Sequence, residues 1–420
     1  MSRYLVDLRI ALFQLNPQIG QLEQNIERSW KLITNFKQKL ETHKNVKFPQ
    51  IVVFPELALT GYSFHSQNEI KPYISLTEKS PTFQFAQRVS KLFNCYTVIG
   101  YPEEGPDLKW YNSALVTDPM GKLTFNYRKS FLYDTEYEWD CQENPKGFQK
   151  FPLTFQKNAV KVNDKDQSPQ DITLNSSIGI CMDLNPYKFQ APFNEFEFAS
   201  FNLNNNIDLM ICPMAWLHSK SVTNHDHDED IINEKLNSLK HDLKSQGLPS
   251  YGSQNDFQFD LNNSNVSMRI PKDDDSIDTD YTEMDKPDMS NVNYWMLRFL
   301  PFLNLSVRKS WYKQLYNDRH DEDIFDDQNK TYIGMSRDKC WEFEGKNSLL
   351  LLNNRCGIED DKTVFAGSSG IFKLNGKTTR SDNDYETNID SMNESVELLG
   401  NLGKGLEGVI MRDVQFEVEK

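Results

Sequence analysis

Apolar stretches of strand length alternate with amphipathic helical stretches through the first half of the chain, and this alternation limits the possible folds more than any other feature. Residues 8–15 form an apolar run, after which apolar side chains recur at helical spacing over residues 22–40. Residues 50–57 and 95–103 repeat the strand pattern around a second helix, 81–93, which opens with proline. This order of elements predicts an α/β fold.

Later segments indicate that the sheets are mixed. Residues 111–132 predict two strands around an Asp-Pro-Met-Gly turn, which favours an antiparallel hairpin. Residues 177–183 and 207–216 contain further strands with a helical stretch between them. After a long polar stretch, strand patterns return at 347–357, 363–376 and 407–419. We expect these late strands to complete the sheets begun in the first half.

The polar stretch between residues 218 and 339 predicts an insertion. Its segment 271–290 contains eight acidic residues and two lysines, a composition that buries little apolar surface. We therefore expect a single domain over residues 1–420, with a core at 5–217 and 345–418 and an exposed, partly disordered insertion. The apolar run 294–305 inside the insertion is too short to span a bilayer, and we expect it to be buried rather than to lie on a membrane.

The charge balance narrows the range of partners. The 46 basic and 61 acidic residues give a net charge of −15, which disfavours binding to nucleic acid or anionic membranes. The six cysteines lack the spacing of a disulfide framework or a zinc site, and the first residues lack a secretory signal pattern.

His225 and His227 lie in an acidic loop where nothing fixes a coordination geometry. We expect a cytoplasmic protein with no metal and no nucleic-acid or membrane partner.

Three chemically active residue types stand at the ends of predicted strands. Glu56 follows an apolar run and a proline, Lys129 interrupts an aromatic-rich strand, and Cys181 ends a short apolar run. A cysteine nucleophile needs a base, and most of the seven histidines lie in polar stretches, so a carboxylate is the better candidate. Each residue alone is more often structural or solvated. Together, in the order Glu, Lys, Cys, they indicate a catalytic site.

The segments FPELALTGY, YRKSFLYDTE and GICMD around these residues resemble the three signature segments of the nitrilase superfamily, whose catalytic triad is Glu, Lys and Cys in this order. The resemblance extends to NRCGIEDDKTVFAGSSGIF and implies an αββα four-layer sandwich. The longer segments NYRKSFLYDTEYEWDCQENPKGFQKFP, CMDLNPYKFQAPFNEFEFASF and ESVELLGNLGKGLEG resemble the fungal N-terminal asparagine/glutamine amidohydrolases of the N-end rule pathway.

The resemblance implies roles for particular residues. Cys181 would be the nucleophile, Glu56 the general base, and Lys129 the cation beside the developing oxyanion. The ammonium group would also lower the pKa of the thiol, and the backbone N–H of Met182 would be a second oxyanion donor. The supporting glutamate of the family falls on Glu136, with Glu138 as the rival; for either, a surface charge is the alternative interpretation.

The resemblance also implies the reaction: deamidation of N-terminal Asn and Gln of proteins to Asp and Glu, through a Cys thioester, with release of ammonia and without a cofactor. The partners would be protein N-termini and N-end rule enzymes, and the protein could be a monomer or a homodimer. A small-molecule amidase or carbamoylase would keep the same triad and is the main alternative. A nitrile hydrolase and an inactive N-terminus-binding module rank lower; the inactive module would be expected to lose a triad residue.

Recognition of an N-terminus requires an anion for the α-ammonium group. Asp183, two residues after Cys181, and Asp134 are the best-placed acids, although each could instead brace the site or cap a helix. Trp216 and Met214 end the strand pattern at 207–216, and we expect them to line the pocket, with core packing as the alternative.

Overall fold

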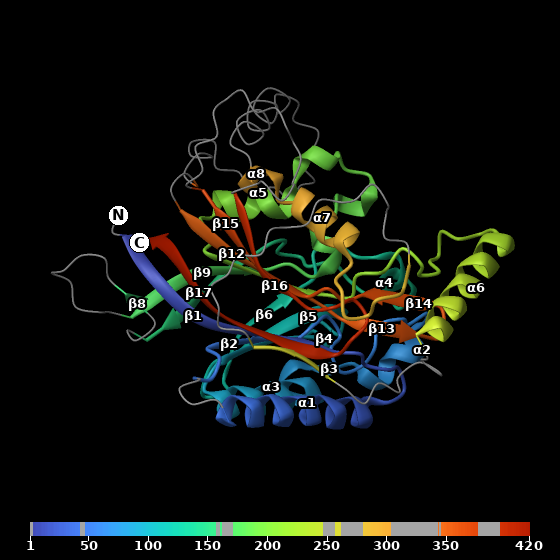
Figure 1. The fold of residues 1–420 in the computed structure, drawn as a ribbon, viewed down its shortest axis with the longest axis horizontal. Coiled ribbons are helices and arrows are strands. Elements are labelled where there is room, and N and C mark those ends of the chain that lie inside the picture. Colours follow the sequence, from blue (N-terminus) through green and yellow to red (C-terminus); the bar gives the residue numbers. More distant parts are fainter. Residues whose placement is uncertain are drawn as a thin grey trace.

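In the computed structural model, two β-sheets lie face to face between two layers of helices (Figure 1). The structure describes residues 3–42, 47–156, 160–161, 171–246, 257–261, 280–303, 343, 346–376 and 395–420. The expectation of partial disorder between residues 218 and 339 falls in part on residues outside these ranges.

The first sheet is mixed, as the hairpin pattern predicts. Strand β1 pairs in parallel with β2, which pairs in parallel with β4, whereas β4–β5, β5–β6 and β1–β17 are antiparallel. The order of the main strands is β11 (Gln258–Asp260), β17 (Gly408–Glu419), β1 (Arg3–Gln14), β2 (Ile51–Val53), β4 (Tyr96–Glu104), β5 (Trp110–Thr117) and β6 (Leu123–Arg128), with β3 (Ser75–Leu76) beside β4 and β8 (Val160–Lys161) beside β1.

The second sheet combines strands from both halves of the chain. Its three central strands, β9, β10 and β12, are parallel. Strands β7 and β15 pair antiparallel with β9 and β12, and β16 pairs antiparallel with β15. Its order is β16 (Val396–Asn401), β15 (Gly370–Asn375), β12 (Asn347–Asn354), β10 (Leu209–Met214), β9 (Ile172–Ile178) and β7 (Lys150–Phe155). The late strands thus complete the sheets, as predicted. Strands β13 (Cys356–Glu359) and β14 (Thr363–Ala366) form a separate ribbon.

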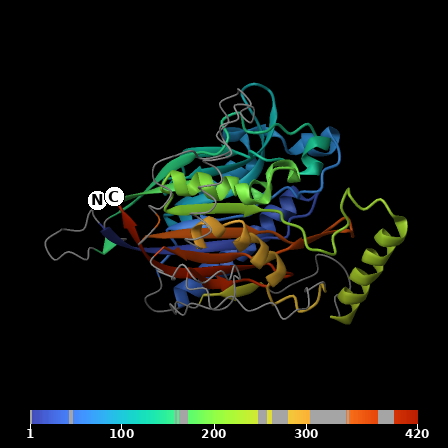
Figure 2. The same ribbon diagram turned by 90° about the horizontal axis from the view of Figure 1, so that it is seen from above.

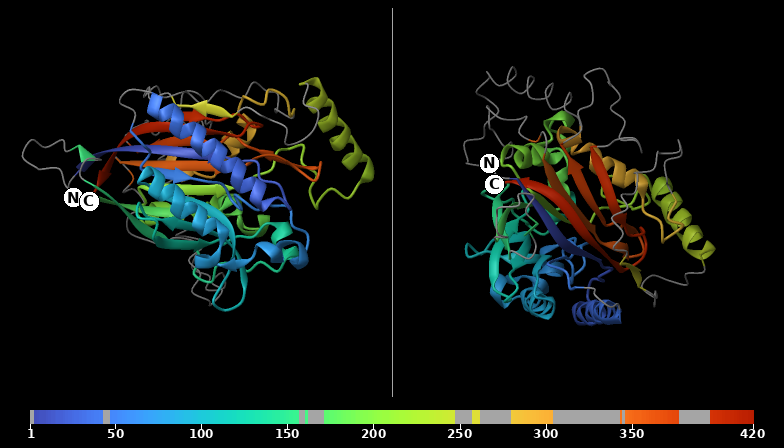
Figure 3. Two further views of the ribbon diagram at one scale, coloured as in Figure 1. Left: turned by 90° about the horizontal axis from the view of Figure 1, so that it is seen from below. Right: turned by 60° about the vertical axis from the view of Figure 1, so that its left-hand side comes forward.

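Helices cover the outer faces of both sheets. Helices α1 (Leu22–Thr42) and α3 (Pro81–Phe93) lie side by side on the first sheet (Figure 3), where Phe36 of α1 packs edge-on against Phe13 of β1. Helices α5 (Glu197–Asn204), α7 (Met289–Leu297) and α8 (Leu300–Leu303) cover the second sheet (Figure 1). The predicted αββα order of layers is therefore confirmed.

Shorter elements lie mostly around the ends of the sandwich. Helix α6 (Glu229–Ser245) stands apart from the sheets at one end (Figure 2). The remaining helical segments are α2 (Gln67–Ile70), α4 (Asp134–Glu138) and the 3₁₀ turns η1 (Lys71–Tyr73), η2 (Thr77–Lys79), η4 (Cys181–Leu184), η5 (Tyr187–Phe189) and η6 (Phe193–Glu195). None of the described helices is both long enough and apolar enough to cross a membrane.

The main core fills the space between the sheets and continues under α7. It includes Ile10, Val53 and Val116 of the first sheet and Leu174, Ile211 and Leu350 of the second. Val292, Trp295 and Met296 of α7 belong to the same cluster and are 0% exposed. The apolar run that begins at residue 294 is therefore buried as far as Leu303, as expected, and α7 extends the buried segment back to Val292 within the acidic stretch.

Candidate active site

Glu56, Lys129 and Cys181 meet at one end of the sandwich although they follow strands of different sheets. Glu56 comes after β2 and Lys129 directly after β6 in the first sheet, and Cys181 comes after β9 in the second. Because the two sheets pack face to face, the segments that leave their carboxyl ends lie opposite each other. Residues far apart in the sequence thus form one cluster.

Lys129 is the centre of a buried ion cluster. Its Nζ lies 2.7 Å from Glu56 Oε1 and 2.8 Å from Glu136 Oε1, and none of the three side chains is more than 1% exposed. Burial alone would lower the pKa of Lys129, but the negative charges of Glu136 and Glu56 outweigh burial and raise this pKa well above its ordinary value. The ammonium group is therefore charged at neutral pH.

The structure places Glu136, not Glu138, in this cluster. Burial raises the pKa of Glu136; Lys129 opposes the rise and Glu56 adds to it. Its second oxygen accepts a hydrogen bond from the backbone N–H of Tyr133 at 2.6 Å, which fixes the first turn of α4. Glu138 instead lies at the surface, with its Oε2 3.0 Å from a ring nitrogen of His65.

Glu56 is held so that one carboxylate oxygen stays free. Oε1 accepts hydrogen bonds from Lys129 Nζ and from Asn112 Nδ2, both at 2.7 Å. Oε2 is buried and has no hydrogen-bond partner among the described residues. Gly100 of β4 allows the Glu56 backbone to come this close to the sheet, because a Cβ at this glycine would lie only 2.6 Å from the Glu56 Cα.

Cys181 is the first residue of η4, in the strained turn that follows β9. Its φ of 43° lies in the left-handed region, which non-glycine residues adopt at a cost and mostly at functional sites. Gly179, two residues earlier, lies against Phe198, whose ring would be 2.7 Å from an added Cβ. The Cys181 side chain is 7% exposed and borders a cavity of about 330 Å³.

The Cys181 thiol is protonated at rest. Burial raises its pKa well above the ordinary value, the negative charge of Glu56 adds to this effect, and Lys129 opposes it. Lys129 lowers the pKa of the thiol, as expected, but burial and the Glu56 carboxylate outweigh the ammonium group. A thiol of this kind needs a base before it can attack a carbonyl carbon, and Glu56 has a free oxygen for that proton.

Asp183 lies beneath the cavity and not in its wall. The side chain is 0% exposed. Each of its oxygens accepts two hydrogen bonds, from the backbone N–H groups of Ser130, Phe131 and Ile180 and the hydroxyl group of Tyr127, over 2.7–3.0 Å. The geometry thus favours a brace between the segments that carry Lys129 and Cys181 over an ammonium ligand, because all four acceptor positions are occupied.

The other expected pocket residues divide between the cavity and the core. Trp216 and Met182 line the cavity. Met214 does not: its side chain is 0% exposed at the end of β10 and packs in the core between the sheets, so the alternative of core packing holds for it. Asp134 opens α4 beside the cavity residue Tyr133, and its carboxylate lies 2.6 Å from His225 Nε2.

Most of the cavity wall comes from residues that the sequence did not single out. They are Tyr62, Tyr133, Asn185, Phe189, Ala215, Leu217, Thr223, Asn291 and Tyr294. Asn291 and Tyr294 belong to α7, and the aromatic run beginning at residue 294 is the only sequence signal for that wall. Within the described ranges, no group of three or more His, Cys, Asp or Glu side chains is arranged to hold a metal ion.

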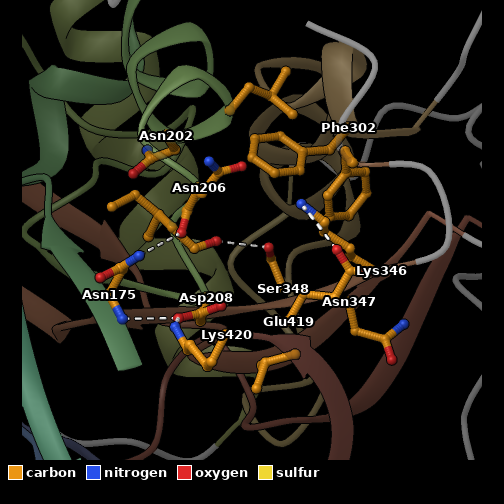
Figure 4. A pocket seen from close by; sticks show the side chains of 14 residues that line it. Asn175, Asn202, Asn206, Asp208, Phe302, Lys346, Asn347, Ser348, Glu419 and Lys420 are labelled. Carbon is orange, nitrogen blue, oxygen red and sulfur yellow. Dashed lines mark hydrogen bonds and ion pairs between the residues drawn. The ribbon is translucent and has the colours of Figure 1, made fainter. Parts of the chain in front are cut away.

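A second cavity, of about 220 Å³, lies at the amino ends of β10 and β12 (Figure 4). Its charged groups pair with one another: Lys420 contacts Asp208, and Lys346 Nζ lies 3.7 Å from Glu419. No cysteine or histidine lines it. The groups suited to nucleophilic chemistry therefore belong to the cavity at Cys181.

Comparison with known proteins agrees with this geometry. A family model described as carbon-nitrogen hydrolase matches residues 9–185. The protein N-terminal amidase of Saccharomyces cerevisiae is 49% identical over 450 residues, which cover 99% of this chain and 97% of that protein. The protein N-terminal amidase of Schizosaccharomyces pombe is 31% identical over 249 residues, which cover 56% of this chain and 76% of that protein.

Crystal structures of an N-terminal amidase match the whole fold. A cysteine-to-serine variant superposes with a TM-score of 0.86 at 47% identity, with 100% of both chains covered. A complex of such an amidase with an Asn-Glu-Ala peptide gives 0.85 at 48% identity, again over 100% of both chains. This chain therefore belongs to the carbon-nitrogen hydrolase family and, within it, to the protein N-terminal amidases, which are hydrolases of carbon-nitrogen bonds.

Proposed function

We propose that the protein removes the side-chain amide nitrogen of asparagine or glutamine at the N-terminus of a polypeptide, leaving aspartate or glutamate and releasing ammonia. One observation carries the proposal: a cavity borders a protonated thiol that has a free carboxylate oxygen and a charged ammonium group beside it. The related crystal structures contain Gln-Val and Asn-Glu-Ala peptides, so both first residues are candidate substrates here.

The first step is acylation of Cys181. Glu56 Oε2 takes the thiol proton, and Sγ attacks the side-chain carboxamide carbon of the substrate. Lys129 and the backbone N–H of Met182 stabilise the oxyanion that forms. The carbon–nitrogen bond then breaks, and the nitrogen leaves as ammonia with the proton returned by Glu56. Glu136 supports the step by sharing the Lys129 ammonium group at 2.8 Å.

The second step is hydrolysis of the thioester. Glu56 takes a proton from water, and the resulting hydroxide attacks the thioester carbon. When the carbon–sulfur bond breaks, the sulfur regains the proton from Glu56, and the product carries a carboxylic acid in place of the amide. Glu56 thus accepts a proton in both steps. It can do so because its Oε2 has no other hydrogen bond among the described residues.

Substrate selection requires a binding site for the α-ammonium group. We assign this role to Asp134, which follows the cavity residue Tyr133 at the start of α4 and has a side chain that is 31% exposed. Burial, followed by the charge of Asp134, raises the pKa of the Tyr133 hydroxyl group. Trp216 forms another part of the wall around the bound residue.

The proposed reaction suggests the pathway and the compartment in which the protein works. The reaction converts a neutral side chain at a protein N-terminus into an acidic one, the step that the N-end rule pathway uses to prepare a chain for degradation. The cysteines within the described ranges form no disulfides, as expected for a reducing compartment such as the cytoplasm. Protein N-termini and other enzymes of that pathway are the partners that we propose.

The test is ammonia release from peptides that differ only at the N-terminus. Peptides that begin with Asn or Gln should release ammonia, whereas peptides that begin with Ala-Asn or acetyl-Asn should not. Mass spectrometry should find one mass unit added to the first residue. Equal release from acetyl-Asn peptides or from simple amides would replace this function with that of a general small-amide hydrolase.

A further inference from the structure

The geometry points to Asn112 as a positioning residue for the reaction: its side-chain amide holds Glu56 with one oxygen turned toward Cys181 and allows Glu56 and Glu136 to occupy one site. Asn112 lies in β5, is 0% exposed, and is absent from the cavity wall. It therefore acts through other residues and not on the substrate. This inference deepens the proposed function and depends on the base role assigned there to Glu56.

Asn112 and Lys129 bind the same pair of oxygen atoms. The Nδ2 group of Asn112 donates to Glu56 Oε1 at 2.7 Å and also to Glu136 Oε1. The Nζ of Lys129 donates to these oxygens at 2.7 and 2.8 Å. The two nitrogens and two oxygens thus form a closed ring of four hydrogen bonds.

The orientation of the amide follows from its neighbours. If the amide were turned around, Oδ1 of Asn112 would face two carboxylate oxygens, and three acceptors would meet without a proton between them. The backbone adds a further link, because the Lys129 N–H donates to the Asn112 carbonyl at 2.8 Å. One residue therefore fixes the Glu56 side chain and the Lys129 main chain together.

The charges explain why a neutral donor is needed. Two carboxylates beside one ammonium leave a net charge of about −1 in a buried site, and neighbouring carboxylates tend to share a proton, which raises a pKa. An amide donor reduces this repulsion without adding charge. It leaves Oε2 of Glu56 outside the ring and unpartnered, and the Glu56 charge acts on the Cys181 thiol.

Other titratable groups around the cluster must be considered in any pH experiment. Glu136 and Lys129 share the ring. Tyr62 faces the carboxylates from the cavity, and burial followed by the charges of Glu136 and Glu56 raises its pKa. Cys141 lies on the Asn112 side, and burial raises its pKa well above the ordinary value. Both groups stay protonated at neutral pH, so the acidic limb of a rate profile reports on the carboxylates.

The experiment compares N112A and N112D with S113A, a matched control in the same strand. Ser113 is equally buried but bonds Glu103 at 2.6 Å, outside the cluster. N112A should lower kcat by about 100-fold, the cost of a small displacement of a reacting group, with KM little changed. The acidic limb of its kcat/KM profile should move up by about one pH unit. N112D, which adds a third carboxylate, should shift the limb further, and S113A should not shift it.

A second measurement separates this inference from the proposed function. The rate at which iodoacetamide alkylates Cys181 depends on proton removal from the thiol and needs no peptide substrate. Its pH profile should shift in N112A as the kinetic profile does, even if Asn and Gln peptides prove to be poor substrates. The role of Asn112 would be overturned by any of three results. They are an acidic limb of the pH profile that does not shift in N112A, an effect of N112A on KM alone, and an equal loss of kcat in S113A. If N112D does not fold, N112A still provides both the kinetic and the alkylation pH profiles.

Discussion

Cys181 differs from the other described cysteines in its backbone, and not in its burial. Cys95 is also buried, and burial raises its pKa to about 12, yet its sulfur lies beside the hydroxyl group of Thr97 with no carboxylate nearby. Cys181 has a φ of 43°, the only positive φ among the described cysteines. A buried packing residue has no need of a strained backbone, whereas a nucleophile presented at a turn does.

The first prediction concerns this thiol. C181A should abolish ammonia release while the melting temperature stays within a few degrees of the wild-type value, because the side chain adds little packing at the edge of the cavity. C181S should be almost as inactive, because a carboxylate base cannot readily remove a hydroxyl proton. Activity assays and thermal denaturation of both variants test this. Substantial turnover by C181A would assign the nucleophile elsewhere.

The second prediction separates the base role of Glu56 from any role in folding. E56Q keeps Oε1, which accepts both hydrogen bonds, and changes only the free oxygen. It also removes one negative charge from a cluster with excess negative charge, so the free energy of unfolding should change little. Both acylation and thioester hydrolysis should slow, by about 10²- to 10⁴-fold. Single-turnover kinetics with denaturant unfolding would measure both effects, and a loss of stability without a loss of rate would make Glu56 structural.

The third prediction uses the pH dependence of the Asp183 brace. Burial raises the pKa of Asp183 to about 7, although its hydrogen-bond donors and Lys129 act in the opposite direction. The folded protein then holds this proton at pH values where the unfolded chain has released it. The resulting stability is complete below about pH 4 and is lost as the pH rises to about 7, at about 1.4 kcal/mol per pH unit.

Replacement of the group should remove this slope. The free energy of unfolding of D183N should therefore fall less steeply than that of the wild-type protein between pH 4.5 and pH 6.5, a difference of about one proton bound. Urea denaturation over that range measures it. Parallel curves for the two proteins would mean that Asp183 is ionised throughout.

At the scale of elements, α7 joins the cavity to the loop that follows Cys181. The indole N–H of Trp216 donates to Asn291 Oδ1 at 2.9 Å, and the hydroxyl group of Tyr294 donates to Asn185 Oδ1 at 2.7 Å. The Trp216 ring also lies 5.6 Å from the ring of Tyr294. This helix therefore sets the position of one wall, although it comes from the acidic part of the chain.

The fourth prediction tests the hydrogen bond between α7 and this loop. Y294F keeps the ring packing and removes one neutral hydrogen bond, worth about 1 kcal/mol. We expect KM for Asn and Gln peptides to rise by about fivefold with a smaller change in kcat. Y96F is a matched control, because Tyr96 donates to the Thr154 carbonyl at 3.0 Å far from the cavity. Equal kinetics for the two variants would show that the contact does not shape the site.

Periodicity in the sequence predicts most elements of the sandwich because each strand and helix buries a regular face. The same reasoning finds the buried run that begins at residue 294 but misses residues 289–293, the first part of α7, since the acidic stretch around them hides their helical pattern. It also misses Asn112, which interrupts the apolar strand β5 without any turn signal; an amide at such a position is itself a clue, because asparagine is rare in strands. The Glu, Lys and Cys at the ends of β2, β6 and β9 can be identified from the sequence. The oxygens shared around Lys129 cannot, because they come together only when α4 folds against the edge of the first sheet.

At the scale of the whole molecule, the site suits a cationic chain end. The protein carries a net charge of −15, so the field around it attracts an ammonium group over distances of about one Debye length. Asp134 lies at the start of α4 beside the cavity and is 31% exposed, and its contact His225 is 69% exposed. A substrate ammonium group can therefore reach this carboxylate from solvent, whereas the buried Asp183 is closed to it.

The fifth prediction follows from that arrangement. Acetylation of an Asn peptide removes the cation and adds bulk to a cavity of about 330 Å³, so kcat/KM should fall by about 100-fold or more. D134N should lower kcat/KM for the free peptide by about tenfold, the cost of one charged hydrogen bond, and should leave the acetylated peptide unchanged. E78Q, which neutralises an exposed acid elsewhere on the surface, controls for the loss of long-range attraction. If D134N and E78Q weaken the free peptide equally, the ammonium group is held by another residue, and if D134N lowers both peptides alike, Asp134 supports the fold of α4 instead.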